Sequence, residues 1–366
     1  MTEPDPQTLR RGWTTGACAT AATRAAIEAL RTGQFPDPVE IGLPGGQRVA
    51  FSLARTAIGN GYAEAGVVKD AGDDPDVTHG ALIVVKLGVG APGSGVVFKA
   101  GEGVGTVTRP GLPIPPGEPA INPVPRQMMR QTIAEAIAAY GGSDDLIIEI
   151  SVPGGARLAE RTLNGRLGIL GGLSILGTTG IVVPFSCAAW IHSIHRGIDV
   201  ARACGLTHVA ATTGSTSEAA IQRLYDLPEV ALIDMGDFVG GTLKYLAKHP
   251  VPRVSVGGGI AKMAKLGQGL MDLHSKRGEV DLVLLAERMH EAGGSAELVA
   301  RVPTMNSALE VLEAARTEGV DLGSAVAEAA WAAAAPVLAG TGIALDIVVF
   351  DRQGGLVGRS AVRTSE

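Results

Sequence analysis

Several residue types that define common protein classes are scarce in this sequence. Aromatic residues make up 4% of the chain, too few for the stacking platform that binds single-stranded nucleic acid. The net charge of −6 disfavours DNA or RNA as the main partner. The three cysteines, Cys18, Cys187 and Cys204, form no CxxC pair. This argues against a disulfide framework and indicates a reducing compartment.

Common catalytic and cofactor motifs are also absent. The chain has no HExxH, no GxSxG and no P-loop, so the familiar zinc protease, serine hydrolase and nucleotide triphosphatase signatures are missing. The glycine runs GEGVGT (101–106) and GGGIAK (257–262) lack the third glycine of a dinucleotide fingerprint. A nicotinamide cofactor is therefore disfavoured.

No long hydrophobic run is suited to crossing a membrane. Residues 168–191 carry no charge, but Gly, Ser, Thr and Pro184 interrupt them too often for a membrane-spanning helix. We expect a buried, glycine-rich loop region that ends in a short helix. The acidic, proline-bearing segment 1–11 is unlike a signal peptide. These patterns predict a soluble, cytoplasmic protein that binds no membrane.

Glycine is the residue in excess, with 51 among 366 residues, about twice the average usage. The glycines are not periodic, so they indicate backbone positions with positive φ or a close approach to another group. A chain of this length with 46% apolar residues is expected to fold as two domains.

The expected fold class is α/β. Residues 1–200 predict a mixed α+β domain with long Gly/Pro-rich loops, one of them the proline-rich segment 109–125. Residues 201–366 alternate strand and helix, which predicts a doubly wound, mostly parallel, Rossmann-like domain. Whether residues 296–366 stay with that sheet or return to the first domain is left open by the sequence.

The segment RGWTTGACATAATRAA (11–26) begins a helix that carries almost only small side chains. One interpretation is a helix start at Thr14, Thr15 and Gly16 whose free N–H groups meet a ligand. The other is a plain threonine N-cap followed by an alanine helix packed against a sheet.

Four carboxylates and an imidazole lie within the short segment KDAGDDPDVTH (69–79). Its spacing is not that of an EF-hand, so the alternatives are another divalent-metal site, an acid/base cluster or a solvated acidic turn. Apolar flanks place the segment at a strand end. The catalytic candidates are Asp70, Asp73, Asp74 and His79.

Three strands of the second half end in small or acidic residues. Anions and cofactors bind at such strand ends, so one continuous ligand crevice is expected there. Two structural alternatives remain open. Ser215 could be an N-cap that forms a capping box with Glu218. Asp234 or Asp237 could bind a ribose, or Asp237 could instead be a helix N-cap. The cofactor-binding candidates are Thr213, Gly214, Ser215, Asp237, Gly257 and Gly258.

Three further groups have weaker signals. His274 and Lys276 bind an acidic substrate or end a solvated helix. His192 and His195 share a helix face, but no third metal ligand is evident, and we predict no protein metal site. Cys18 is expected to be a small buried residue rather than a nucleophile.

Five long motifs, in order, resemble the cobalt-precorrin-5B C1-methyltransferases of corrin-ring biosynthesis over nearly the whole chain. They are RRGWTTGACATAATRAA, VVKDAGDDPDVTHGA, GEGVGTVTRPGLPIPPGEPAINPVPR, TLNGRLGILGGLSILGTTGIVVPFS and KMAKLGQGLMDLHSKRG. The resemblance implies methyl transfer from S-adenosylmethionine to C1 of a cobalt-containing tetrapyrrole, giving cobalt-precorrin-6A. The cobalt arrives in the substrate.

Such a substrate is a broad disc with acetate and propionate arms, so it requires a flat slot with cations at its rim. The ring is expected between the domains. Its binding candidates are Thr14, Thr15, Gly16, Asn164, Gly172, Thr178, Thr179, His274 and Lys276, and the other rim candidates are Arg10, Arg11, Arg126, Arg130, Arg166, Lys262, Lys265 and Arg277.

The sequence leaves two rival functions open. One is a non-catalytic carrier of a corrinoid intermediate, and the other is a nicotinamide-dependent precorrin reductase. The sequence does not decide the oligomeric state, although a homo-oligomer is compatible with it.

Overall fold

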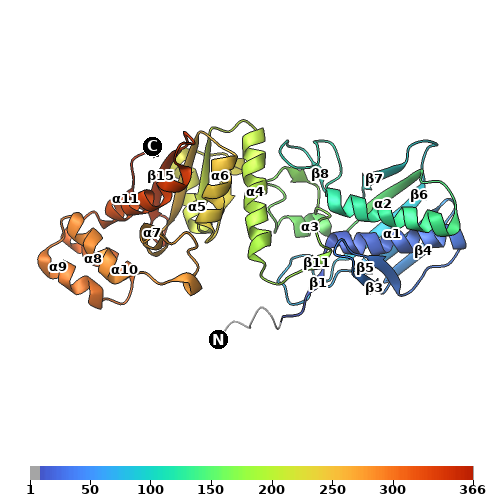
Figure 1. The fold of residues 1–366 in the computed structure, drawn as a ribbon, viewed down its shortest axis with the longest axis horizontal. Coiled ribbons are helices and arrows are strands. Elements are labelled where there is room, and N and C mark those ends of the chain that lie inside the picture. Colours follow the sequence, from blue (N-terminus) through green and yellow to red (C-terminus); the bar gives the residue numbers. More distant parts are fainter. Residues whose placement is uncertain (1–8, 366) are drawn as a thin grey trace. The chain divides into compact units, whose positions relative to one another are not determined.

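The structure, a computed structural model, describes residues 9–365, and they form two compact units that divide between Ser186 and Cys187 (Figure 1). We call residues 9–186 unit 1 and residues 187–365 unit 2. Most of segment 1–11, for which we expected no signal peptide, lies outside the described residues.

Unit 1 is built on a five-stranded sheet of order β4-β5-β6-β9-β7. Neighbouring strands are antiparallel except β9 and β7, which are parallel. Alternate residues of β5 and β6 are buried in one core, as the two-residue period of a strand requires. The strands are β4 (Arg55–Gly59), β5 (Tyr62–Val68), β6 (Leu82–Val89), β7 (Val96–Ala100) and β9 (Leu146–Ser151).

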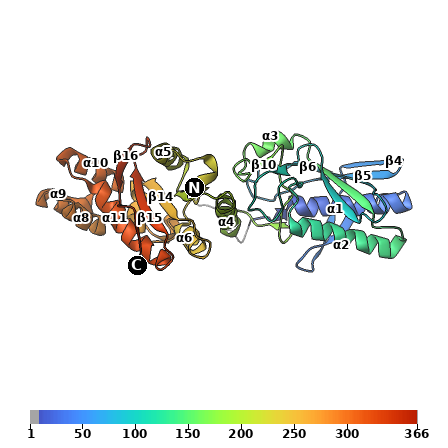
Figure 2. The same ribbon diagram turned by 90° about the horizontal axis from the view of Figure 1, so that it is seen from above.

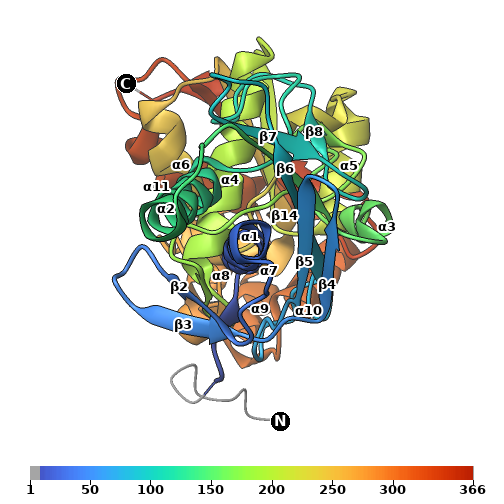
Figure 3. The same ribbon diagram turned by 90° about the vertical axis from the view of Figure 1, so that its right-hand side faces the viewer.

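Helix α1 (Thr15–Thr32) lies in the middle of unit 1, packed against β5, β6 and α2 (Pro123–Tyr140) (Figure 3). Thirteen of its residues are buried, which alanine permits because it lets the helix axis approach its neighbours on every side. Thr14 caps the helix, since its Oγ1 accepts a hydrogen bond from the Ala17 amide at 3.1 Å. The interpretation of a threonine-capped alanine helix against a sheet is therefore confirmed.

Small elements complete unit 1. Strand β2 (Val39–Gly42) pairs with β3 (Arg48–Phe51), β1 (Gly12–Trp13) with β11 (Ile181–Val182), and β8 (Thr106–Val107) with β10 (Ile169–Leu170). Helix α3 (Gly155–Ala159) follows β9. The proline-rich segment stays irregular as far as Pro123, where α2 begins with prolines in its first turn.

Unit 2 contains the predicted parallel sheet, in the order β13-β12-β14-β15-β16, with β17 beside β15. The first four strands are parallel, and β15, β16 and β17 form antiparallel pairs. Helix α5 (Ser215–Tyr225) covers one face of the sheet and α6 (Val239–Lys248) the other (Figure 2). The strands are β12 (His208–Thr212), β13 (Leu232–Asp234), β14 (Arg253–Gly259), β15 (Ala344–Phe350), β16 (Leu356–Arg359) and β17 (Arg363–Thr364).

The remaining helices of unit 2 surround the same core. They are α4 (Cys187–Ala203), α7 (Ile260–Gly267), α8 (Leu282–Glu291), α9 (Ala296–Arg301), α10 (Ala308–Glu318) and α11 (Leu322–Ala334). The described part of unit 2 also contains four 3-10 turns: η1 (Glu229–Ala231), η2 (Ser275–Arg277), η3 (Val302–Thr304) and η4 (Ala335–Leu338).

Three expectations differ from the structure. The boundary expected after residue 200 falls inside α4, whose Ile194 and Ile198 are buried in the core of unit 2, so the division precedes the helix. Helices α8 and α9 were not predicted. The uncharged segment 168–191 is not wholly buried, because Leu170, Phe185 and Trp190 are exposed.

Residues 296–366, whose place was left open, belong to unit 2 as far as the structure describes them. Their strand β15 pairs along its whole length with β14, at the centre of the sheet. Within residues 9–365, no helix combines the length and apolarity needed to cross a membrane.

Candidate functional site

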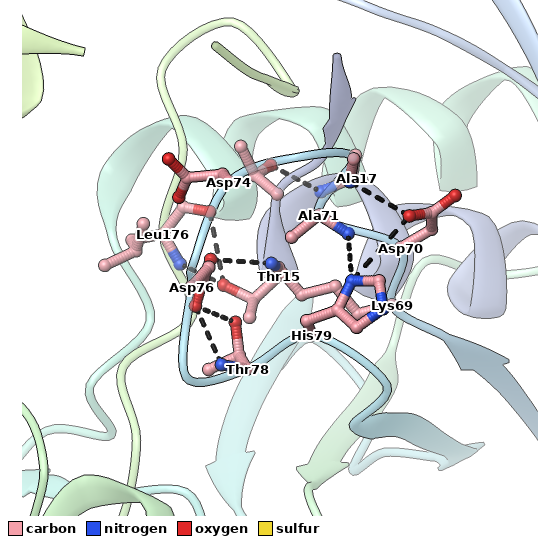
Figure 4. A network of polar contacts seen from close by, with 12 residues as sticks. Thr15, Ala17, Lys69, Asp70, Ala71, Asp74, Asp76, Thr78, His79 and Leu176 are labelled. Atoms are coloured by element: carbon pink, nitrogen blue, oxygen red, sulfur yellow. Dashed lines mark hydrogen bonds and ion pairs between the residues drawn. The ribbon is translucent and has the colours of Figure 1, made fainter. Parts of the chain in front are cut away.

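Residues 69–79, which we call the acidic loop, join β5 to β6 and are anchored by a buried ion pair. Lys69 is 1% exposed, and its Nζ lies 2.7 Å from Oδ2 of Asp76. The other carboxylate oxygen accepts hydrogen bonds from the amide and hydroxyl of Thr78 at 2.7 and 2.6 Å. Burial alone raises the pKa of Asp76, but the bonds and charge of Lys69 lower it overall. Asp76 is therefore a structural anion of the loop (Figure 4).

Asp70 is also fully engaged. Its two oxygens accept hydrogen bonds from the Arg10 guanidinium, and Oδ1 also accepts one from the Gly72 amide at 2.9 Å. The hydrogen bond from Arg10 and then that from Gly72 lower the pKa of Asp70 to about 2. This carboxylate is a poor proton acceptor at neutral pH, and it holds residues 10–13 against the loop.

Asp73 and Asp74 each keep one oxygen without a hydrogen bond to any described residue. Oδ2 of Asp73 accepts a bond from the Arg10 amide at 2.7 Å, and Oδ1 of Asp74 accepts one from the Phe185 amide at 2.9 Å. Asp73 is exposed and Asp74 is half-buried. Their second oxygens are available to a substrate.

The His79 ring is exposed and is held in one tautomer. The Ala71 amide donates a hydrogen bond to Nδ1 at 3.1 Å, so in the neutral ring the proton is on Nε2. Neutral His79 therefore presents its Nε2–H donor to solvent. The acidic loop thus combines two accessible acceptors with one donor.

The start of α1 and the loop 171–180, which we call the glycine loop, are bonded to each other. The Gly16 amide donates to the Leu176 carbonyl at 2.9 Å, and the Leu176 amide donates to Thr15 Oγ1 at the same distance. The Thr14 amide donates a hydrogen bond to the Gly180 carbonyl. The amides of Gly16 and Ala17 consequently have acceptors within the chain, and Thr15 is only 3% exposed.

Other predicted residues shape the glycine loop from inside or lie on its surface. Asn164 is buried, and its Nδ2 donates to the Gly172 carbonyl at 3.1 Å. A Cβ on Gly172 would lie 2.2 Å from the Gly103 oxygen, so only glycine fits there. Thr178 and Thr179 are exposed. Trp13, whose amide bonds the Asp70 carbonyl at 2.7 Å, joins α1 to the acidic loop.

Unit 2 has a pocket of about 470 Å³ at the carboxyl ends of β12, β14 and β15. Helices α5 and α7, which follow β12 and β14, lie on opposite faces of the sheet, so this is a topological switch point, the usual ligand position in open α/β sheets. We call it the switch-point pocket. It is lined by Thr213, Gly214, Ser215, Thr216, Ser217, Gly259, Ile260, Ala261, Lys262, Ser307, Ala308, Leu309, Phe350, Asp351 and Arg352.

The switch-point pocket contains half of the predicted cofactor residues. Thr213, Gly214 and Ser215 line it, and Gly258 lies beside them, since a Cβ there would be 2.8 Å from Thr213 Oγ1. Gly257 lies one residue earlier in β14, against Ile221. The capping-box alternative is wrong, because Gly214 is the N-cap of α5 and Ser215 is already helical.

Asp237 is neither an N-cap nor a pocket-lining residue. The N-cap of α6 is Phe238, and the Asp237 carboxylate is ion-paired with Lys262, which does line the pocket. The Asp237 carbonyl also accepts the Leu273 amide at 2.9 Å. Asp237 therefore positions a pocket residue and the segment that contains His274.

The other predicted groups have mostly structural contacts. Nδ1 of His274 accepts the Lys276 amide at 3.2 Å at the start of η2. Among the rim candidates, Arg10, Arg126, Lys262 and Arg277 are paired with Asp70, Glu118, Asp237 and Asp272, respectively, Lys265 is buried, and Arg11 and Arg130 are exposed.

Cys18 and the histidine pair take no part in a described site. Cys18 is 0% exposed, which confirms a small buried residue, and this burial raises the pKa of its thiol to about 12. His195 stacks on Tyr245, with ring centroids 3.8 Å apart, and no set of three His, Cys, Asp or Glu residues within 9–365 is placed to hold a metal ion.

Sequence reasoning missed the walls of the switch-point pocket that come from distant segments. Ser307 is the N-cap of α10, and Asp351 and Arg352 directly follow β15. No local motif marks them, because they reach the pocket only through the β14–β15 pairing. The one available signal was the apolar run IALDIVVFD, which is typical of a strand in a parallel sheet.

Comparisons with known proteins identify the class. A family model described as CbiD matches residues 2–184, and a second, CbiD, C-terminal domain, matches residues 272–361. The chain therefore belongs to the CbiD family.

Its relatives are similar along nearly their whole length. The proteins named cobalt-precorrin-5B C(1)-methyltransferase from Bradyrhizobium sp. and Agrobacterium fabrum are 63% and 62% identical over 98% of this chain and 95% and 94% of their own. A crystal structure of the cobalamin biosynthesis protein (cbiD) from Archaeoglobus fulgidus covers 85% of both chains at 26% identity, with a TM-score of 0.40.

Proposed function

We propose that this chain transfers a methyl group from S-adenosylmethionine to C1 of cobalt-precorrin-5B, giving cobalt-precorrin-6A in cobalamin biosynthesis. The observation that carries the proposal is the 63% identity, over 98% of the chain, to a protein named for this activity. The sulfonium methyl is already activated, so the enzyme's main contribution is to align donor and ring carbon. This requires two binding sites and a proton acceptor rather than a strong nucleophile.

The donor site in this proposal is the switch-point pocket. Its volume of about 470 Å³ lies within the range of about 300–1,000 Å³ typical of small-molecule sites. Thr213, Gly214 and Ser215 approach it from the β12–α5 turn and Lys262 from α7. The hydroxyl of Thr212, buried just before this turn, has no hydrogen-bond partner among the described residues.

The ring site in this proposal is on unit 1, where the acidic loop, the glycine loop and the start of α1 meet. Leu176 and Phe185 provide exposed apolar surface there, which suits a flat macrocycle. Thr14, Thr15 and Gly16 act by holding the glycine loop, because their polar groups are already bonded to it.

The proton acceptor in this proposal is Asp73 or Asp74, whose free oxygens distinguish them from Asp70. As the S–CH3 bond breaks and the C–CH3 bond forms, S-adenosylhomocysteine leaves and positive charge moves onto the ring, from which a nearby carboxylate removes a proton. Replacement of Asp73 or Asp74 by Asn should therefore reduce turnover while ring binding persists. Asp70→Asn should affect both, since it releases Arg10 and the segment against the loop.

The direct test is anaerobic incubation of the purified protein with cobalt-precorrin-5B and isotopically labelled S-adenosylmethionine. Mass spectrometry should detect the label in the tetrapyrrole. Calorimetry with the donor alone separates the carrier alternative, which predicts ring binding without donor affinity. Binding of NADPH would instead favour the reductase.

A further inference from the structure

The two lysines of α7 next to the switch-point pocket carry more positive charge than their surroundings neutralise. Lys262 pairs with Asp237, and its Nζ lies 3.3 Å from the Leu273 carbonyl oxygen. Lys265 is 8% exposed, and its Nζ reaches the same oxygen at 3.4 Å. Within residues 9–365, Lys265 has no ion pair with a carboxylate. Two ammonium groups thus share one carboxylate and one carbonyl, which leaves one positive charge uncompensated.

The carboxylate in the pocket lining does not supply the missing negative charge. Oδ2 of Asp351 lies 3.1 Å from the Arg316 guanidinium. Its Oδ1 accepts amide hydrogen bonds from Gly355 and Gln353 at 2.7 and 3.0 Å. Asp351 is therefore neutralised by Arg316 of α10 and bonded to amides of the turn that follows β15.

The helices add to the same electrostatic field. Both α5 and α7 begin at the pocket, with Gly214 and Gly259 as their N-caps, and neither has a side-chain cap. Their first-turn amides point toward the pocket with the positive end of the helix dipole. Together with the partly exposed Lys262, they form a site that favours an anion.

We infer that this corner of the pocket binds a carboxylate, that of the amino-acid end of the donor, with Lys262 as its cationic ligand. Asp237 is then a positioning residue that holds Lys262 at the edge of the pocket. The inference rests on the proposed function. The amino-acid end of the donor presents one compact carboxylate to this corner, whereas the ring carries several acetate and propionate arms.

The test compares two ligands that differ at this end. S-Adenosylhomocysteine has the carboxylate, and 5′-methylthioadenosine lacks the amino-acid end. We expect Lys262→Met to weaken S-adenosylhomocysteine about 10- to 100-fold in calorimetry, the usual loss for a charge-assisted hydrogen bond, while methylthioadenosine stays within about twofold. Retained methylthioadenosine binding also establishes that the variant is folded.

Two matched variants complete the design. Lys262→Arg keeps the charge and should keep most of the affinity for S-adenosylhomocysteine. Lys244→Met removes an exposed lysine of α6 that does not line the pocket, and should leave both affinities unchanged.

The outcomes separate the inference from the proposed function. If the unmodified protein binds neither nucleoside, the donor part of the proposed function fails. If it binds both and Lys262→Met weakens them equally or not at all, the inference is overturned and the proposed function stands. Uroporphyrin, a stable tetrapyrrole with acetate and propionate arms, tests whether the carboxylate that Lys262 binds belongs to the ring instead of the donor. Binding of uroporphyrin that depends on Lys262, when that of S-adenosylhomocysteine does not, also overturns the inference.

Discussion

Replacing Thr15 by Val tests the hydrogen bond that connects α1 to the glycine loop. The change is nearly isosteric, and it removes the oxygen that accepts the Leu176 amide at 2.9 Å. Thr15 is 3% exposed, so water replaces this acceptor poorly. An amide left without a partner in such a place costs about 1–3 kcal/mol. For a unit of this size, each kcal/mol lowers Tm by roughly 2–4 °C.

Two variants in the same helix calibrate that loss. Thr15→Ser keeps the acceptor and should retain most of the stability. Thr20→Val removes a buried hydroxyl that donates to the Gly16 carbonyl at 2.8 Å. That carbonyl is already an acceptor in the helix, so no donor is left unpaired and the cost should be small.

The assay combines thermal unfolding with hydrogen exchange of a peptide that includes Leu176. Thr15→Val should lower Tm and speed exchange in the glycine loop, with reduced ring binding as a consequence. Equal effects of Thr15→Val and Thr20→Val, or unchanged exchange at Leu176, would refute the reasoning.

Two further predictions concern the stability of each unit. In unit 1, Gly12→Ala would place a Cβ 2.0 Å from the Ala71 carbonyl carbon. It should cost at least about 1–3 kcal/mol by urea unfolding, whereas Gly45→Ala, which meets open space, should cost little. In unit 2, burial and then the charge of Arg253 lower the pKa of His208, so folding favours its neutral form. Its contribution to stability is present at pH values above the unfolded pKa, about 6.5, and is lost as pH falls through it toward the folded value. Thermal melts at pH 7.5 and 5.5 should therefore show a smaller Tm loss for His208→Gln than for the unmodified protein, and an equal loss would reject this role.

Regular elements were predictable where one face is apolar. The apolar runs LIVVKLGV (82–89) and IALDIVVFD (343–351) match strand periodicity and form β6 and β15, and the strand–helix alternation of the second half predicted the parallel sheet. Helices α8 and α9 were missed because EVDLVLLAERMHEAGGSAELVAR (279–301) has short apolar stretches that do not separate a helix from a loop.

The sequence motifs of the site could be predicted, but the hydrogen bonds and ion pairs within it could not. The clustering of the start of α1, the acidic loop and the glycine loop follows from glycines such as Gly12 and Gly177, which allow close backbone approach. The partners of Asp70 and Asp237 lie 60 and 25 residues away, and no local pattern encodes such ion pairs. Hence sequence analysis placed Asp70 and Asp73 together, whereas only the structure distinguishes a bonded carboxylate from one with a free oxygen.

One measurement tests the central claim most directly. The protein is incubated anaerobically with cobalt-precorrin-5B and S-adenosylmethionine that carries a 13C-labelled methyl group, and the demetallated product is analysed by NMR. The account predicts one new labelled methyl group, on C1 of the ring, with S-adenosylhomocysteine formed in equal amount. Absence of label from the ring, with a substrate that a known relative methylates under the same conditions, would contradict it.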